Sequence, residues 1–106
     1  MTRKFQRFNQ EKLPHKSVKM SDAIALIDHV DDWIEIETSE HCMTYMGSTR
    51  RNGGWGFELM AYEENEGELS YQGFVVKGEA STTLSPVEAQ NAFYVARKSY
   101  LKSAGG

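Results

Sequence analysis

The first regular pattern of apolar positions along the chain has a helical period. Ile24, Ile27 and Val30 lie three residues apart, which predicts a short amphipathic helix. Ser21 precedes them and has a side chain suited to an N-cap. We expect this helix to end near Asp31.

After this helix the period shortens to two, which is the period of a β-strand. Asn52-Gly53 separates two such segments, and this dipeptide favours a hairpin turn with positive φ at both positions rather than a phosphate-binding loop that leads into a helix. Gly67 supplies the same backbone freedom in the next turn. The pattern therefore predicts four antiparallel strands, at residues 33–38, 42–46, 55–62 and 69–78.

The clearest local signal is the start of a second helix. Ser85 can cap it, Pro86 suits its first position, and Glu88 completes a capping box. Small residues dominate the apolar positions that follow, which is typical of a helix that packs closely on a sheet; these positions are Ala89, Ala92, Phe93, Ala96 and Tyr100.

The order of these elements predicts an α+β fold of two layers. We expect a four-stranded antiparallel meander with the short N-terminal helix and the C-terminal helix on one face. A chain of 106 residues has the length of one domain. Residues 1–19 lack a clear period and are interpreted as a basic, flexible arm, and residues 20–106 as the domain.

Strand alternation then predicts which side chains are left for binding. If Ile34, Ile36, Phe57 and Leu59 pack under the helices, the other face of the sheet combines aromatic residues, methionine and acids. The glycine-rich loop beside it displays two arginines and a tryptophan. The predicted partner-binding residues are Trp33, Glu35, Glu37, Arg50, Arg51, Trp55, Glu58, Met60 and Tyr62.

The net charge of −3 conceals an uneven distribution. Residues 1–19 carry a net charge of +5, residues 20–70 one of −10, and residues 71–106 one of +2. An acidic centre attracts basic partners and repels phosphate backbones. The partner predicted for the central sheet is therefore a basic protein surface, and the basic arm of a second copy would be one in a homodimer.

Other residue types add little chemistry. The single cysteine, Cys42, forms no internal disulfide, which fits the cytoplasm, and the longest apolar stretch, residues 23–27, is too short to span a membrane. The basic N-terminus is followed by no apolar run, so no secretory signal is expected. His41 and Cys42 are neighbours on a strand and point to opposite faces. We expect no catalytic residue, no metal site and no cofactor.

These patterns favour a small non-enzymatic protein-binding module. It would act as a homodimer or as an accessory or inhibitor protein of the kind that phages and other mobile elements encode. Two alternatives stay open. One is nucleic-acid binding through the basic arm and the loop that carries Arg50, Arg51 and Trp55, and the other is an enzyme whose site has no recognisable motif.

Overall fold

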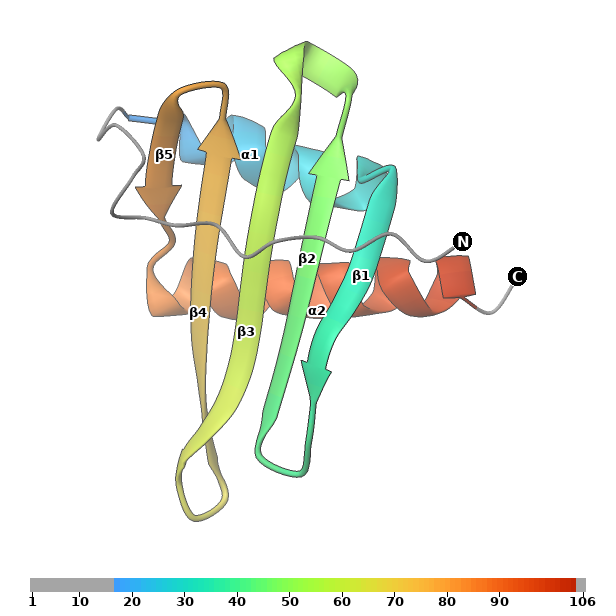
Figure 1. The fold of residues 1–106 in the computed structure, drawn as a ribbon. Coiled ribbons are helices and arrows are strands. Elements are labelled where there is room, and N and C mark those ends of the chain that lie inside the picture. Colours follow the sequence, from blue (N-terminus) through green and yellow to red (C-terminus); the bar gives the residue numbers. More distant parts are fainter. Residues whose placement is uncertain (1–16, 105–106) are drawn as a thin grey trace.

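A single sheet of five antiparallel strands forms the centre of the computed structural model, which describes residues 17–104 (Figure 1). Each strand pairs with the next one in the chain, so the sheet is a meander in the order β1-β2-β3-β4-β5. The strands are β1 (Asp32–Thr38), β2 (Cys42–Thr49), β3 (Trp55–Asn65), β4 (Glu68–Lys77) and β5 (Ala80–Thr83).

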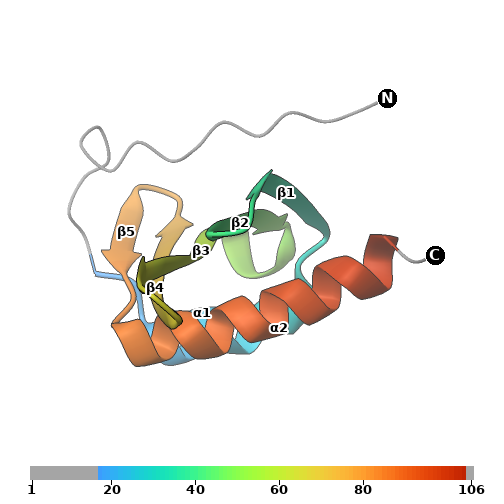
Figure 2. The ribbon, with the colours of Figure 1, turned by 90° about the horizontal axis from the view of Figure 1, so that it is seen from below.

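Two helices cover one face of this sheet (Figure 2). α1 (Met20–Leu26) continues into a short 3₁₀ turn at Ile27–His29, and α2 (Pro86–Ala104) closes the described part of the chain. The predicted α+β sandwich is thus confirmed, with one strand more than expected. The predicted arm at residues 1–19 lies outside the described residues except for its last three positions.

The additional strand is β5, which follows β4 after a two-residue turn. Gly78 has φ +58° in this turn, and Lys77 pairs with Ala80 across it. Glycine at the first central position of such a turn is typical of a hairpin. The strand itself is four residues long and has no alternation of apolar positions, so the sequence pattern did not reveal it.

The N-terminus of α2 has the predicted capping box. The backbone N–H of Glu88 donates to Ser85 Oγ at 3.3 Å, and the backbone N–H of Ser85 donates to Glu88 Oε1 at 3.0 Å. Both bonds satisfy donors that a helix start would otherwise leave unpaired. The bond from the Ser85 N–H to the Glu88 carboxylate also stabilises the charged form of that carboxylate, and it holds the pKa of Glu88 below its ordinary value.

The predicted cap of α1 was wrong. The helix begins at Met20, its N-cap position is Lys19, and no side chain caps it. Ser21 therefore lies inside the first turn. The end of the helix was predicted closely, since the 3₁₀ turn stops at His29 and Val30 is extended.

The loop between β2 and β3 is the predicted hairpin connection, but it is longer than a two-residue turn. Thr49 pairs with Trp55, so residues 50–54 form the loop, with a 3₁₀ turn at Arg51–Gly53. Asn52 has φ +49° and Gly53 has φ +84°, as the dipeptide predicted. The loop leads into a strand and offers no helix N-terminus to a phosphate.

The main core lies between the helices and the sheet. Phe57 and Leu59 are fully buried there, as predicted, and four small or aromatic residues of α2 pack against them. These α2 residues are Ala89, Ala92, Phe93 and Ala96. The three alanines let the helix approach the strands closely. Because both helices lie on this side, the opposite side of the sheet is left for other contacts.

Candidate functional site

The side of the sheet that faces away from the helices is here named the outer face. Its centre is formed by side chains that are neighbours across strands: Met46 pairs with Glu58 and Glu58 with Phe74, while Met60 pairs with Gln72. Glu58, Met60 and Tyr62 alternate along β3 with buried core residues, so all three point outward as predicted. None of the described helices lies over this face (Figure 2).

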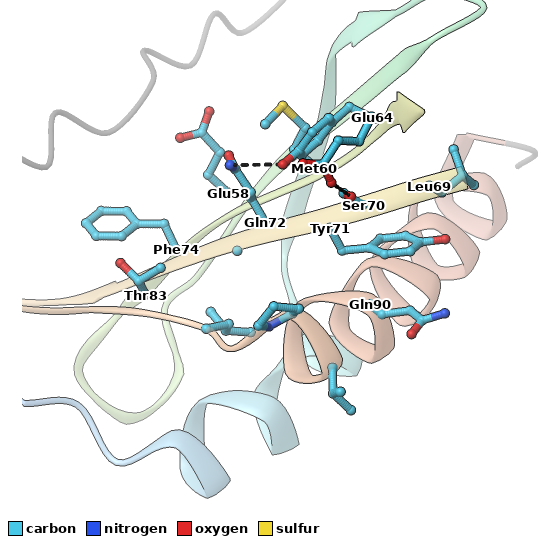
Figure 3. A pocket seen from close by; sticks show the side chains of 15 residues that line it. Glu58, Met60, Glu64, Leu69, Ser70, Tyr71, Gln72, Phe74, Thr83 and Gln90 are labelled. Carbon is cyan, nitrogen blue, oxygen red and sulfur yellow. Dashed lines mark hydrogen bonds between the residues drawn. The ribbon is translucent and has the colours of Figure 1, made fainter. Parts of the chain in front are cut away.

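A hollow of about 670 Å³ lies on the outer face and continues around the edge of β4 (Figure 3). Its lining combines apolar side chains with carboxylates and amides, in a mixture typical of protein-contact surfaces. Met60 and Tyr62 come from β3, Leu69 from β4 and Val87 from the start of α2. The sequence pattern predicted Glu58, Met60 and Tyr62. It did not include Glu64, which lies beyond the predicted end of that strand, or the β4 and α2 members, whose side chains meet β3 only in the folded sheet.

Hydrogen bonds between neighbouring strands orient the polar part of this lining. Gln72 Nε2 donates to the Tyr62 hydroxyl at 3.4 Å. The Ser70 hydroxyl donates to the Glu64 carboxylate. Both bonds are drawn in Figure 3, and they connect the Tyr62 hydroxyl and the Glu64 carboxylate of β3 to polar side chains of β4.

Two apolar side chains of the outer face are buried. Met46 is fully buried and Phe74 is 5% exposed, although neither belongs to the core cluster under the helices. Glu58, Met60 and Tyr62 are half-buried beside them. The outer face thus combines two buried apolar side chains, Met46 and Phe74, with the partly exposed side chains of Glu58, Met60 and Tyr62.

Strand β1 has the opposite orientation to the predicted one. Trp33 pairs with Gly47, and its ring lies on the helix side, 6.2 Å from the ring of Phe57 between centroids. Ile34 pairs with Met46 of the outer face. The prediction was wrong because both isoleucines were assigned to the core, whereas the glycine at position 47 leaves space there for the larger indole.

Glu35 also lies on the helix side, opposite Tyr45, and so does not belong to the predicted surface. Burial raises the pKa of the Tyr45 hydroxyl, and the Glu35 carboxylate raises it further. A register irregularity between Glu35 and Glu37 then changes the alternation, so that Glu37 pairs with Thr44 of the outer face. Of the three β1 residues predicted for this surface, only Glu37 lies on the same face of the sheet as Glu58.

Trp55 is not displayed on the loop, and this prediction was also wrong. It is 4% exposed and stacks on Phe57, with ring centroids 6.4 Å apart and an angle of 15° between the planes. Lys77 Nζ lies 4.9 Å from the ring centroid. The sequence did indicate this burial, because alternate residues of a strand point to the same face, and Trp55 alternates with the core residues Phe57 and Leu59.

Arg50 and Arg51 are exposed on the loop, as predicted, but they are not isolated cations. They line a shallow depression together with Asp31 and Asp32. The backbone N–H of Arg50 donates to Asp31 Oδ2 at 2.8 Å. The two carboxylates offset the two guanidinium charges, so this surface lacks the strong positive field that a phosphate backbone requires.

Residues 17–104 contain no group of three His, Cys, Asp or Glu side chains placed to hold a metal ion. His41 Nδ1 lies 2.6 Å from Glu63 Oε2 at the surface. Cys42 is a free, half-buried thiol whose Sγ lies 4.0 Å from Thr44 Oγ1. No helix in this part of the chain has the length and apolar character to cross a bilayer.

Comparison of the chain with protein-family models, with curated proteins and with solved structures gives no match. The candidate site therefore rests on the geometry of the outer face alone.

Proposed function

We propose that this protein is a non-enzymatic binding module whose outer face holds a basic segment with apolar side chains from a protein partner. One observation supports this most strongly. Met60 and Tyr62 lie beside Glu58 and Glu64 around a single hollow, and the described helices all lie on the other side of the sheet.

Both parts of this surface would contribute to binding. Burial of the apolar groups provides affinity at about 25 cal/mol per Å² removed from water. Tyrosine and methionine are enriched at protein contacts, because each offers a large area with limited polar cost. The carboxylates select against acidic partners and accelerate the approach of basic ones.

The chain itself contains a segment with this chemistry. Residues 1–19 carry a net charge of +5 and include Phe5 and Phe8. A second copy is thus one of the partners that the outer face would accept, besides an unrelated protein with a basic and apolar segment.

The experiment is a selection of 12-residue peptides displayed on phage against the full-length protein. We expect enrichment of peptides that combine lysine or arginine with aromatic or aliphatic residues. Binding of an enriched peptide should weaken when the salt concentration rises from 0.05 to 0.5 M, because the Debye length falls from about 14 Å to about 4 Å.

Two matched variants then locate the binding surface. Glu58→Lys reverses a charge on the outer face, and Glu66→Lys makes the same change in the β3–β4 turn. We expect Glu58→Lys to reduce peptide affinity about tenfold or more, and Glu66→Lys to change it less than threefold. Peptides without a basic bias, or equal effects of the two variants, would contradict the proposal.

Binding of nucleic acid through the arginine loop has weaker support. Trp55 is in the core and is not available for stacking on bases, and Asp31 and Asp32 adjoin the arginines. A gel-shift assay at low salt tests this alternative directly. A shift that disappears in Arg50→Glu and persists in Glu58→Lys would favour it over the outer face.

A further inference from the structure

The two edges of the sheet differ in how they are protected against pairing with other strands. β1 forms one edge, and it carries acidic side chains and a register irregularity between Glu35 and Glu37. Charges and bulges are the usual devices that prevent an edge strand from adding a partner. This edge is therefore poorly suited to strand addition.

The other edge is incomplete. β5 pairs only with residues 74–77 of β4, and in Figure 1 the remaining half of β4 extends past the end of β5. The backbone N–H of Leu84 donates a hydrogen bond to the carbonyl oxygen of Gly73 at 2.9 Å. Among the described strands, none pairs with residues 69–72 on that side. We name these four residues the open edge.

The backbone of the open edge points toward a missing neighbour. The carbonyl of Gly73 faces the β5 side, as its bond from Leu84 shows. In an antiparallel strand the hydrogen-bonding direction alternates, and the N–H and C=O of one residue point the same way. The backbone groups of Tyr71 and Leu69 therefore face outward, away from β3, and together offer two donors and two acceptors.

The open edge has none of the protective features of β1. Its sequence, Leu-Ser-Tyr-Gln, contains no charge and no proline, and its register with β3 is regular from Leu69 to Gln72. The charged Glu68 and the register irregularity of this strand pair lie outside it, directly before Leu69. Leu69 within the open edge, and Val87 and Tyr94 of α2 near it, are large apolar side chains that are exposed. Leu69 is 58% exposed, and it lines the hollow of the outer face together with Val87 of α2. The hydroxyl groups of Tyr94 and Tyr71 are hydrogen-bonded at 3.0 Å.

We propose that the open edge pairs with the open edge of a second copy, antiparallel, so that the two sheets join. In the register that we infer, Leu69 of one copy lies opposite Tyr71 of the other, and each such pair exchanges two backbone hydrogen bonds. A strand that is antiparallel to its own copy has two-fold symmetry, which is the commonest symmetry of homodimers.

Charge restricts where a second copy can bind, and the open edge is a position that it leaves accessible. The chain has a net charge of −3, and residues 20–70 are strongly acidic, so two copies repel each other over most of their central surface. The four residues of the open edge are neutral, so two copies of this edge can pair without placing like charges opposite each other. This dimer does not depend on the proposed binding of a basic segment by the outer face.

The test is sedimentation equilibrium of the full-length protein over a range of concentrations, without added peptide. We expect a monomer–dimer equilibrium. Leu69→Lys should raise the dimer dissociation constant about 10- to 100-fold, the effect of losing one buried leucine contact and placing a charge at the pairing edge. Leu101→Lys is the matched control, since Leu101 is 53% exposed on α2, and it should change the constant less than threefold.

Amide hydrogen exchange of the wild-type protein identifies the contact. The amides of Leu69 and Tyr71 should exchange more slowly as the protein concentration rises, whereas in Leu69→Lys their exchange should not depend on concentration. The heteronuclear NMR spectrum of Leu69→Lys establishes that this variant is folded. A wild-type monomer at every concentration, or a dimer that Leu101→Lys weakens as much as Leu69→Lys does, would overturn the proposal.

Discussion

The indole ring of Trp33 lies directly over the α-carbon of Gly47, its partner across strands β1 and β2. A β-carbon at position 47 would lie 2.5 Å from Trp33 Cε3 and 2.6 Å from Cζ3. Real β-carbons do not approach aromatic carbons so closely. This contact fixes the face on which Trp33 lies and thereby the orientation of the first half of β1.

Gly47→Ala should destabilise the protein by about 1–3 kcal/mol, because the indole must move out of a well-packed position. Urea unfolding followed by circular dichroism measures the change. In a Trp33→Ala background the same substitution should cost much less, since the clashing ring is gone. An equal cost in both backgrounds would show that the contact is not the cause.

Ser85→Ala should lower the free energy of unfolding by about 1 kcal/mol, because the N-cap bond to the backbone N–H of Glu88 is lost. Thermal and urea unfolding report the change. Ser103→Ala makes the same substitution in the exposed last turn of α2 and should alter stability by less than about 0.5 kcal/mol.

Glu63→Gln should reduce stability at neutral pH and have no effect in acid. The backbone N–H of Gly67 donates to Glu63 Oε1 at 2.9 Å, and this bond, with the contact to His41, holds the pKa of Glu63 below its ordinary value of 4.5. A carboxylate with a lowered pKa in the folded state stabilises the fold above the unfolded-state pKa. That contribution disappears as the pH falls below 4.5 and through the folded-state pKa.

Unfolding of the wild type and of Glu63→Gln should therefore be compared in urea between pH 7 and pH 2. The control is Glu66→Gln, which alters an exposed glutamate of the same turn. If the two variants differ from the wild type by the same amount at every pH, the bonds to Glu63 do not explain its effect.

Tyr94→Phe should lower the pKa of Tyr71. The hydroxyl groups of the two residues lie 3.0 Å apart, and the hydrogen bond with Tyr94 raises the pKa of Tyr71 to about 12. The same bond lowers the pKa of Tyr94, so Tyr71→Phe should raise that value toward 10.0. The ¹³Cζ chemical shifts of the tyrosines measure both titrations, and Tyr100→Phe should leave them unchanged.

The elements that the sequence predicted correctly depend on neighbours in the chain. The capping box of α2 uses residues three positions apart, and the Asn52-Gly53 turn depends on the φ preferences of its own residues. Alternation along β3 was also sufficient to place Phe57 inside and Glu58 outside, because one face of that strand is consistently apolar.

The errors arose where a distant residue decides the outcome. Trp33 lies inside because Gly47, on another strand, leaves space for it, and the irregularity before Glu37 follows from pairing with β2. The hollow on the outer face was only half predicted for the same reason. Leu69 and Val87 reach it from β4 and α2, and their positions depend on where β5 ends and α2 begins.

The order of the strands also affects how rapidly the chain can fold. Every neighbouring pair in the sheet is a hairpin joined by a short connection, so strand pairing requires no closure of a long loop. The docking of the two helices brings together segments far apart in the chain, and α2 contacts β1, β2, β3, β4 and the turn at Ile27–His29. Refolding should be fast for a protein built around a β-sheet, with the packing of the C-terminal helix as its slowest step.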